Sequence, residues 1–244
     1  GTVLRIVEER DATEAERAAT LCNSGVVVAD KQVLFQLLGM VRNENAKGEY
    51  YLTDIVGLAR SAGFSTYATI AEEGEVLGVN SRAELAQAEA AFQKRARAAA
   101  MEAGVTLIDP DTVYFSHDTE IGADVKIEPN VFFGAGVKIG SGSTVHAFCH
   151  FERVEIGEGC EVGPFARFRP GARLARKVKI GNFVEVKNSR LAEGVKANHL
   201  AYIGDADVGA RSNIGAGAIT CNYDGFDKYR SEERRVGKEC RSRW

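Results

Sequence analysis

The stretch from Arg167 to Lys196 concentrates positive charge in a chain whose formal net charge is -3. It holds nine Lys or Arg residues and two acidic ones, Glu185 and Glu193. Such a patch in an acidic protein predicts an anionic ligand, and the alternative is a set of charges that only decorate an outer surface. Arg169 lies in a rigid Arg-Pro-Gly turn, and Lys187 follows three hexads later. If three hexads make one turn of a repeating fold, the two cations stack and suit a phosphate.

His199 lies twelve residues beyond Lys187 and is the candidate base of this region. An imidazole can take a proton from an amine or a hydroxyl, as acyl transfer requires, although lone histidines are more often structural. The small residues 215–218 could present a backbone N–H group to a developing oxyanion, and they suit a tight corner equally well. A polar loop follows them, from which Tyr223 and Lys228 can reach a ligand.

The element that must position these side chains is a repeat, because an apolar residue recurs every six positions between residues 119 and 225. Its members include Ile121, Ile127, Phe133, Ile139, Val145, Ile156, Val162, Phe168, Leu174, Ile180 and Val186. A period of six fits neither an α-helix nor a single strand and is typical of a solenoid. We predict a parallel β-helix of about six coils, with three hexads in each coil. The period slips to five at Leu191 and at Val208, where we expect loops that leave the prism.

The residues before the repeat predict a different architecture. Residues 1–80 mix short apolar runs with helical periodicity, which favours an α/β layer. Within it we expect a buried strand at residues 25–29 and a helix at residues 50–62 that ends at Gly63.

A long helix is predicted next, at residues 82–103, because this stretch is rich in Ala, Glu, Gln and Arg and almost free of turn residues. Ser81 can cap its start and Gly104 its end, and Leu85 is expected on a narrow apolar stripe. The predicted domains are therefore the α/β part at 1–80, the linker helix at 81–104, the β-helix at 105–229 and a tail at 230–244 that abandons the repeat.

Composition excludes several classes of protein. The 244 residues are 45% hydrophobic and 27% charged, without a run of about 18 apolar residues, so we expect no membrane insertion. The net charge of -3 argues against nucleic acid as a partner. Five cysteines without a close Cys-x-x-Cys pair indicate a reducing, cytoplasmic setting. The chain does not begin with Met, so we expect it to start within a longer protein. The string RSEERRVGKEC resembles a translated sequencing adapter, so we interpret the tail as non-native.

Several motifs are specific enough to indicate a family. They are IVEERDAT, CNSGVVVA, NAKGEYYLTDI, GVNSR, GPFARFRPGA, IGNFVEVKNSRL, KANHLAYIGDADVG and NIGAGAITCNYDG. With them the chain resembles the bacterial bifunctional N-acetylglucosamine-1-phosphate uridyltransferases and glucosamine-1-phosphate acetyltransferases over residues 1–229. The resemblance implies a truncated Rossmann-like nucleotidyltransferase domain, a linker helix and a left-handed parallel β-helix of hexapeptide repeats. It also implies a homotrimer whose acetyl-transfer site lies between subunits.

The resemblance implies a role for each candidate residue of the β-helix. His199 is then the base that deprotonates the 2-amino group of glucosamine 1-phosphate for attack on acetyl-CoA, and Glu185 orients or polarises its imidazole. The residues expected to hold the sugar phosphate are Arg169, Lys187, Tyr202 and Lys228, and Asn213 is expected to contact the sugar. Those expected to line the acetyl-CoA end are Ala216, Asn222 and Tyr223.

The resemblance also implies uridyl transfer from UTP, with Mg²⁺ as cofactor. Glu8 and Asn23 would contact the sugar nucleotide, and Asn80 would contact both the sugar nucleotide and Mg²⁺. The Gly-rich, Lys-containing loop of the family and the Asp that shares the metal have no counterpart in this sequence. We therefore expect residues 1–80 to be an incomplete Rossmann-like sheet, without uridyltransferase activity.

Further β-helix coils that complete the acetyl-CoA site in the family also have no counterpart, so we expect little or no acetyltransferase activity from this chain alone. Two other readings stay open. One is a left-handed β-helix acyltransferase that acts on another substrate, and the other is a non-catalytic module that only trimerises.

Overall fold

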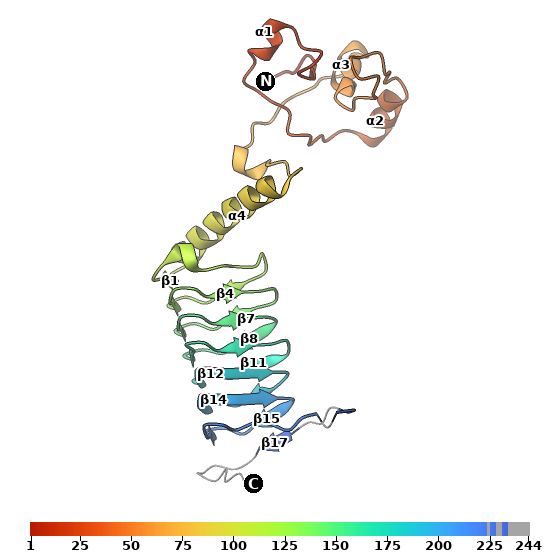
Figure 1. Cartoon of the computed structure of the whole chain (residues 1–244). Helices are drawn as coiled ribbons and strands as arrows, with labels where there is room; N and C mark the ends of the chain where they lie inside the picture. The colour runs from red at the N-terminus through yellow and green to blue at the C-terminus, as the bar shows by residue number, and fades with distance from the viewer. Residues whose placement is uncertain (224, 228–230, 234–244) are drawn as a thin grey trace. The chain divides into compact units, whose positions relative to one another are not determined.

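The computed structural model describes residues 1–223, 225–227 and 231–233 (Figure 1). The chain divides into two compact units, Gly1–Ala88 and Glu89–Trp244.

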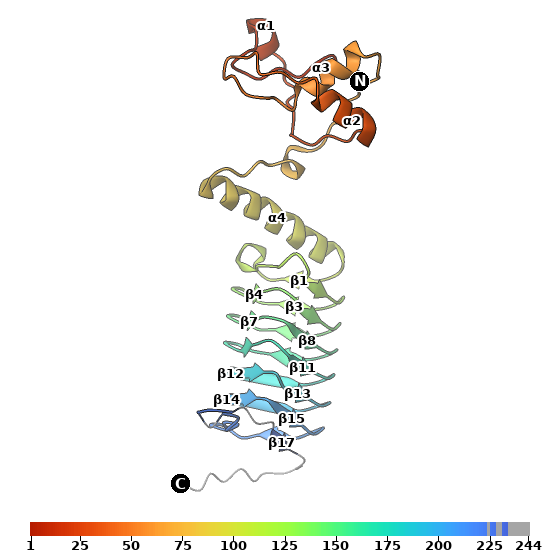
Figure 2. The same ribbon diagram turned by 90° about the vertical axis from the view of Figure 1, so that its right-hand side faces the viewer.

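Three faces of short parallel strands build the second unit, a left-handed parallel β-helix (Figures 1 and 2). Face 1 contains β1 (Thr106–Leu107), β3 (Lys126–Ile127), β6 (Thr144–Val145), β9 (Glu161–Val162) and β16 (Asn213–Ile214). Face 2 contains β4 (Phe132–Phe133), β7 (His150–Phe151) and β10 (Arg167–Phe168). Face 3 contains β2 (Glu120–Ile121), β5 (Lys138–Ile139), β8 (Val154–Ile156), β11 (Ala172–Leu174), β13 (Arg190–Leu191), β15 (Ala206–Val208) and β17 (Ser231–Glu233).

Two longer strands, β12 (Lys179–Lys187) and β14 (Lys196–Gly204), run through face 1, bend, and continue along face 2. The bend that they share is called the 1/2 corner below. It lies at Asn182 in β12 and at His199 in β14, which are paired in register. The two strands pair along almost their whole length, so backbone hydrogen bonds hold the corner on both sides.

The predicted hexad pattern is confirmed by the interior of this unit. Its apolar residues form one continuous buried cluster from Val105 to Val208. Inside it, rings of consecutive coils stack, with centroids 5.2 Å apart for Phe133 and Phe151 and 4.9 Å apart for Phe151 and Phe168. No coil has an interior of its own, because each buried side chain packs on the coils above and below it.

The expectation that the five-residue slips mark loops is wrong. Val186 and Leu191 are consecutive inward residues on either side of a tight corner, at which Asn188 adopts φ 42°. The pairing of Leu174 with Leu191, and of Leu191 with Val208, shows that these coils close one residue short of three full hexads. A short corner still closes a coil when one residue adopts a left-handed conformation, and asparagine tolerates it well.

Helix α4 (Arg82–Glu102) packs its second half on the first coil. The buried Gln93 side chain donates to the carbonyl of Phe115 (2.7 Å) and accepts from its N–H group (2.9 Å). Arg97 donates to the carbonyl of Val113 at 2.9 Å. The helix therefore satisfies backbone groups at the open end of the solenoid, which need partners. Leu85, expected on the apolar stripe, is 55% exposed, and Ala96 and Ala100 pack on the core instead.

The first unit, residues 1–88, has a small core in which Leu37, Ile55 and Ala59 are buried. Its helices are α1 (Glu14–Arg17), α2 (Lys31–Leu38), α3 (Asp54–Ser61) and the short η1 (Glu73–Glu75), and another 3₁₀ turn, η2 (Pro110–Thr112), belongs to the second unit. Helix α3 confirms the centre of the helix predicted at residues 50–62. Its end lies beside Gly63, as predicted, and Gly63 adopts φ 87°.

The buried strand predicted at residues 25–29 is wrong, since this segment is irregular and Val28 is 96% exposed. The only β contact within residues 1–80 is an isolated bridge between Thr2 and Tyr67. An apolar run forms a buried strand only where neighbouring strands receive its hydrogen bonds and a layer covers its face, and this unit has neither. The Rossmann-like sheet is therefore not seen here. Among the described helices, none combines the length and the apolar character needed to cross a bilayer.

Candidate functional site

The imidazole of His199 lies on the 1/2 corner, exposed, and is oriented by a single partner. Its Nδ1 lies 2.8 Å from Oδ1 of Asn182, the residue directly above it in β12. An amide oxygen only accepts hydrogen bonds, so Nδ1 carries a proton, and in the neutral form of the imidazole Nε2 then has the lone pair. The corner thus holds the imidazole by Nδ1 and leaves Nε2 without a hydrogen-bond partner among the described residues.

The pairing of these two side chains depends on Gly181. A side chain at this position would collide with the backbone carbonyl of Asn198 in the next coil. Glycine lets β12 and β14 approach closely at the bend, which brings Asn182 and His199 into register.

The predicted stacking of cations is seen on face 2, where Arg167 pairs with Glu185 and Phe168 with Val186, so that Arg169 and Lys187 follow in register. Both cations contact carboxylates. Arg169 donates to Glu185 at 3.0 Å, and the Lys187 ammonium lies 3.6 Å from Asp205.

The expected contact between Glu185 and His199 is not seen. Glu185 lies beside Tyr202 in the strand pairing, and its two oxygens face Arg169 and Arg167, the latter at 3.6 Å. Residues three apart in neighbouring strands are separated by the bend, so Glu185 cannot orient the imidazole within one chain. Asn182 occupies that role in the geometry.

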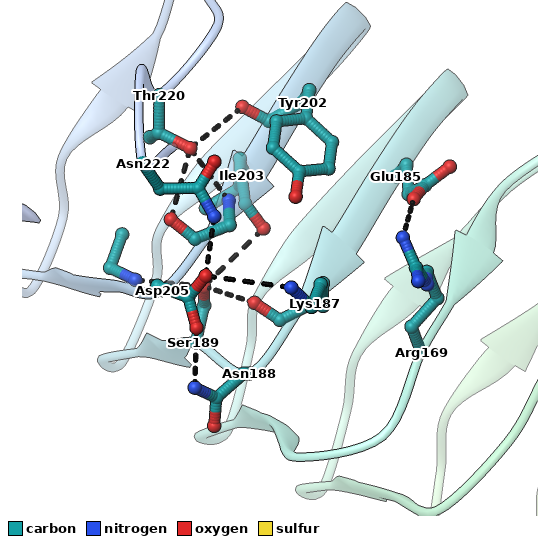
Figure 3. Close-up of polar contacts among 12 residues, drawn as sticks. Arg169, Glu185, Lys187, Asn188, Ser189, Tyr202, Ile203, Asp205, Thr220 and Asn222 are labelled. Carbon is teal, nitrogen blue, oxygen red and sulfur yellow. Dashed lines mark hydrogen bonds and ion pairs between the residues drawn. The ribbon is translucent and has the colours of Figure 1, made fainter. Parts of the chain in front are cut away.

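Asp205 is the central acceptor of the polar cluster beneath Lys187 (Figure 3). It accepts from Asn188 of the coil above (2.5 Å) and from Asn222 of the coil below. Burial opposes ionisation of this carboxyl, but the two amide donors and the Lys187 charge outweigh it, and its pKa lies below the ordinary value. Ser189 completes the cluster by donating to the backbone carbonyl of Lys187 at 2.7 Å.

Tyr202 is half-buried on face 2, and its ring lies over Gly204. A Cβ atom at Gly204 would lie 2.5 Å from the Tyr202 hydroxyl oxygen, so the ring occupies the space that glycine leaves. Thr220 of the next coil fixes this backbone, since its hydroxyl donates to the Gly204 carbonyl at 3.0 Å and accepts from the Gly204 N–H at 2.7 Å. Tyr202 pairs with Glu185, two residues before Lys187 in β12, so Tyr202 and Lys187 share one face.

Other candidates lie elsewhere in this unit. Asn213 is exposed on face 1, paired with Lys196, so one chain does not bring it beside Lys187. Ala216 is exposed, and the N–H of its neighbour Gly217 donates to the Leu200 carbonyl at 2.9 Å. Tyr223 is 59% exposed, whereas Asn222 is buried against Asp205. Lys228 lies outside the described residues.

The candidates of the first unit stand apart from one another. Glu8 accepts from the Thr53 hydroxyl at 3.3 Å, and Asn23 is exposed in an irregular segment. The N–H of Asn80 donates to Glu84 at 2.6 Å, which caps α4. No hydrogen bond in the described part of the chain joins these three candidates.

The residues present do not fit a Mg²⁺ site. Across residues 1–223, 225–227 and 231–233 there is no group of three His, Cys, Asp or Glu side chains that could hold a metal ion. Asn80 alone cannot supply the oxygen ligands that Mg²⁺ needs.

Comparisons with known proteins give the family of the chain. The bacterial transferase hexapeptide family (six repeats) matches residues 118–153. The bifunctional protein GlmU of Zymomonas mobilis subsp. mobilis is 56% identical over 230 residues, and that of Roseobacter denitrificans 58% over 228 residues. The chain belongs to the GlmU family. The alignments cover 94% and 93% of this chain and 51% of each GlmU relative, so the chain spans about half their length.

Among solved structures, a GDP-perosamine N-acetyltransferase from Caulobacter crescentus matches with 19% identity and a TM-score of 0.29, over 66% of either chain. At this level the similarity carries no functional argument. GlmU membership therefore rests on sequence identity and on the hexapeptide repeat.

Two residues of the site, Asn182 and Asp205, were missed by reasoning from sequence. Asn182 precedes His199 by one residue less than three hexads, and Asn188 precedes Asp205 by the same interval. This shortened register, which the slips at Leu191 and Val208 already contained, would have placed both pairs in contact.

Proposed function

We propose that the protein to which this chain belongs acetylates glucosamine 1-phosphate with acetyl-CoA and then transfers uridylyl from UTP, as a cytoplasmic enzyme of UDP-N-acetylglucosamine synthesis. The observation that carries the proposal is the 56% identity with a GlmU protein, together with the free Nε2 of His199 beside a face of cations. The four described cysteines are free thiols, which suits a reducing compartment.

In the proposed acetyl transfer, the 2-amino nitrogen of the sugar attacks the thioester carbonyl, and His199 Nε2 accepts a proton from this amino group. A C–N bond forms, the C–S bond breaks, and the proton passes to the leaving thiolate of CoA. Asn182 keeps the imidazole in the tautomer that can accept this proton. Arg169 and Lys187 hold the phosphate, and Glu185 keeps the Arg169 guanidinium in place.

The test is the release of CoA thiol from acetyl-CoA in the presence of glucosamine 1-phosphate. It is run at high protein concentration on this chain and on a version extended by further hexapeptide coils of the Zymomonas mobilis relative, each with and without His199→Ala. We expect little release by the chain alone, clear release by the extended version, and at least about a hundredfold loss with His199→Ala.

Release that survives His199→Ala would refute the base, and no release by the extended version would refute acetyl transfer to this sugar. Another amino sugar that restores release would then indicate an acyltransferase with a different substrate. Formation of UDP-N-acetylglucosamine by this chain would overturn the expectation that it lacks uridyl transfer.

We also propose that the protein is a homotrimer. Along the 1/2 corner, next to His199, exposed rings stack from coil to coil, with centroids 4.8 Å apart for Phe148 and Phe165 and 5.2 Å for Phe165 and Phe183. Leu200, 60% exposed, continues this apolar ridge. A contiguous apolar ridge marks an interface, and a second copy of the chain is the occupant we propose.

Sedimentation of the chain and of Phe165→Ser tests this interface. We expect a trimer for the chain and a shift towards monomer for the variant. A monomeric wild-type chain, or a trimer unaffected by the substitution, would contradict the proposal. If the chain is a trimer and the extended version keeps every measured property with His199→Ala, the results would favour a module that only oligomerises.

A further inference from the structure

Asp205 is the only acidic side chain that is buried among the described residues. Removing a carboxylate from water is costly unless charge and hydrogen bonds compensate it. The structure supplies both kinds of compensation: Lys187 and Asn188 come from the coil above and Asn222 from the coil below.

The contacts of Asp205 connect two parts of the candidate site (Figure 3). One oxygen accepts from Asn188, and the other accepts from Asn222 and faces the Lys187 ammonium at 3.6 Å. The Lys187 side chain is 20% exposed and that of Asp205 12%, so water screens this pair only weakly. A single carboxylate thus holds a candidate phosphate ligand and a candidate residue of the acetyl-CoA end.

A purely structural role does not require the charge. Asn188 and Asn222 lie above and below Asp205 at the same corner, so an asparagine at this position would continue a ladder of amides without burying an ion. The feature that a carboxylate adds is its attraction for the Lys187 ammonium.

We propose that Asp205 is a positioning residue that fixes Lys187 for the substrate phosphate and ties it to Asn222, so that the two ends of the acetyl-transfer site share one anchor. The inference rests on the proposed function for the roles of Lys187 and Asn222. Asp205 itself touches neither substrate.

The main test measures the Kd of glucosamine 1-phosphate by calorimetry for the wild-type chain, Asp205→Asn and the control Glu155→Gln. Glu155 loses the same charge but lies exposed on face 3 beside Arg173, at 3.6 Å. We expect Asp205→Asn to weaken binding at least about tenfold and Glu155→Gln to leave it within about twofold.

The change in Kd caused by Asp205→Asn separates three roles of the carboxylate. A carboxylate that only neutralises Lys187 would give tighter binding in Asp205→Asn, and one that only stabilises the fold would lower the unfolding temperature without changing Kd. Either result overturns the proposal. In wild-type NMR spectra, the side-chain amide of Asn222 should shift with the same Kd as the ligand, and in Asp205→Asn it should not follow.

A readout without ligand distinguishes failure of the anchor from failure of the proposed function. In the free wild-type chain, the Lys187 ammonium should give a slowly exchanging NMR signal that Asp205→Asn abolishes and Glu155→Gln retains. If the wild-type chain binds no glucosamine 1-phosphate, the phosphate site is refuted, while this signal still decides the anchor. An ammonium signal unchanged by Asp205→Asn overturns it.

If Asp205→Asn does not fold, Asn188→Ala is the variant that tests the anchor. It keeps the carboxylate charge and removes one of its donors, so we expect about threefold weaker binding and a faster-exchanging Lys187 ammonium. Unchanged affinity and unchanged exchange in this variant would overturn the anchor.

Discussion

The two units of the chain treat their apolar residues in opposite ways. In the β-helix, the buried cluster runs without interruption from Val105 to Val208. In the first unit, only Leu37, Ile55 and Ala59 are buried, while Val26 and Val28 are 73% and 96% exposed. The difference follows from how partners are found: a solenoid residue meets its partner one coil away, whereas an α/β layer needs strands from distant parts of the sequence.

This contrast explains why the candidate acetyl-transfer side chains are positioned and the candidate uridyl-transfer ones are not. Asn182 and His199 are paired by the register of two strands, whereas Asn23 lies in an exposed, irregular segment. We expect the first unit to be the less stable one.

Removing a ring from the inner stack should have the largest effect. Phe151→Ala is expected to cost about 3–5 kcal/mol of unfolding free energy, because Phe151 is fully buried between two other rings. Leu37→Ala, in the small core of the first unit, should cost about 2 kcal/mol, since a sparse core collapses around the cavity more easily. Urea denaturation followed by circular dichroism and hydrogen exchange measures both, and equal costs would contradict the contrast.

A pair of glycine substitutions should have effects of opposite sign. Gly181→Ala is expected to destabilise the β-helix by about 1–3 kcal/mol, because the new methyl group meets the Asn198 carbonyl. Gly57→Ala, inside α3, should stabilise the first unit by about 0.5–1 kcal/mol, since the methyl group would lie 3.8 Å from the Arg5 Cβ atom. Thermal unfolding checks both, and a tolerated Gly181→Ala would show that the coils can separate at the bend.

The cap that α4 places on the first coil should matter less. Gln93→Ala removes the donor and the acceptor that satisfy Phe115, and is expected to cost about 1–2 kcal/mol. Gln87→Ala, exposed on the same helix, is the matched control and should be nearly neutral. Hydrogen exchange at the Phe115 amide should accelerate only in Gln93→Ala, and equal exchange in both variants would argue that the helix does not cap the solenoid.

Acid should reveal the smallest difference. In the β-helix, the Lys179 ammonium and then His146 lower the pKa of Glu161. In the first unit, hydrogen bonds from the backbone and then the side chain of Thr13 lower the pKa of Glu16 to about 2. Because both folded-state pKa values lie below the unfolded ones, the stabilisation is present near neutral pH and is lost as the pH falls through the folded values.

Substitution of the partner residues tests these assignments. We expect His146→Gln to make the acid-induced loss of β-helix stability slightly smaller, as measured by urea denaturation between pH 5 and pH 3. Thr13→Ala should raise the Glu16 pKa towards its ordinary value, as followed by NMR, without changing the unfolding of the β-helix. A Glu16 pKa that stays about 2 would assign the shift to Arg5 instead.

Reasoning from sequence found the β-helix because its rule is local. A six-residue period requires only that each apolar residue has a counterpart one coil later, and Phe133, Phe168 and Val186 are buried as that rule predicts. The same reasoning failed at residues 25–29, because an apolar run does not say whether a layer exists to cover it. It also read two tight corners as loops, because left-handed backbone at Asn188 and Asp205 shortens a corner without lengthening the chain.

The same distinction between local sequence rules and folded structure applies to the candidate site. The candidate base, the row of cations and the family follow from residue types and motifs, and so they could be recognised without a structure. The contacts between these side chains depend on the folded chain: Asn182 rather than Glu185 faces His199, and Asp205 holds Lys187. A change of one residue in the length of a coil alters every contact between coils, and that length is set by the backbone conformation at the corners.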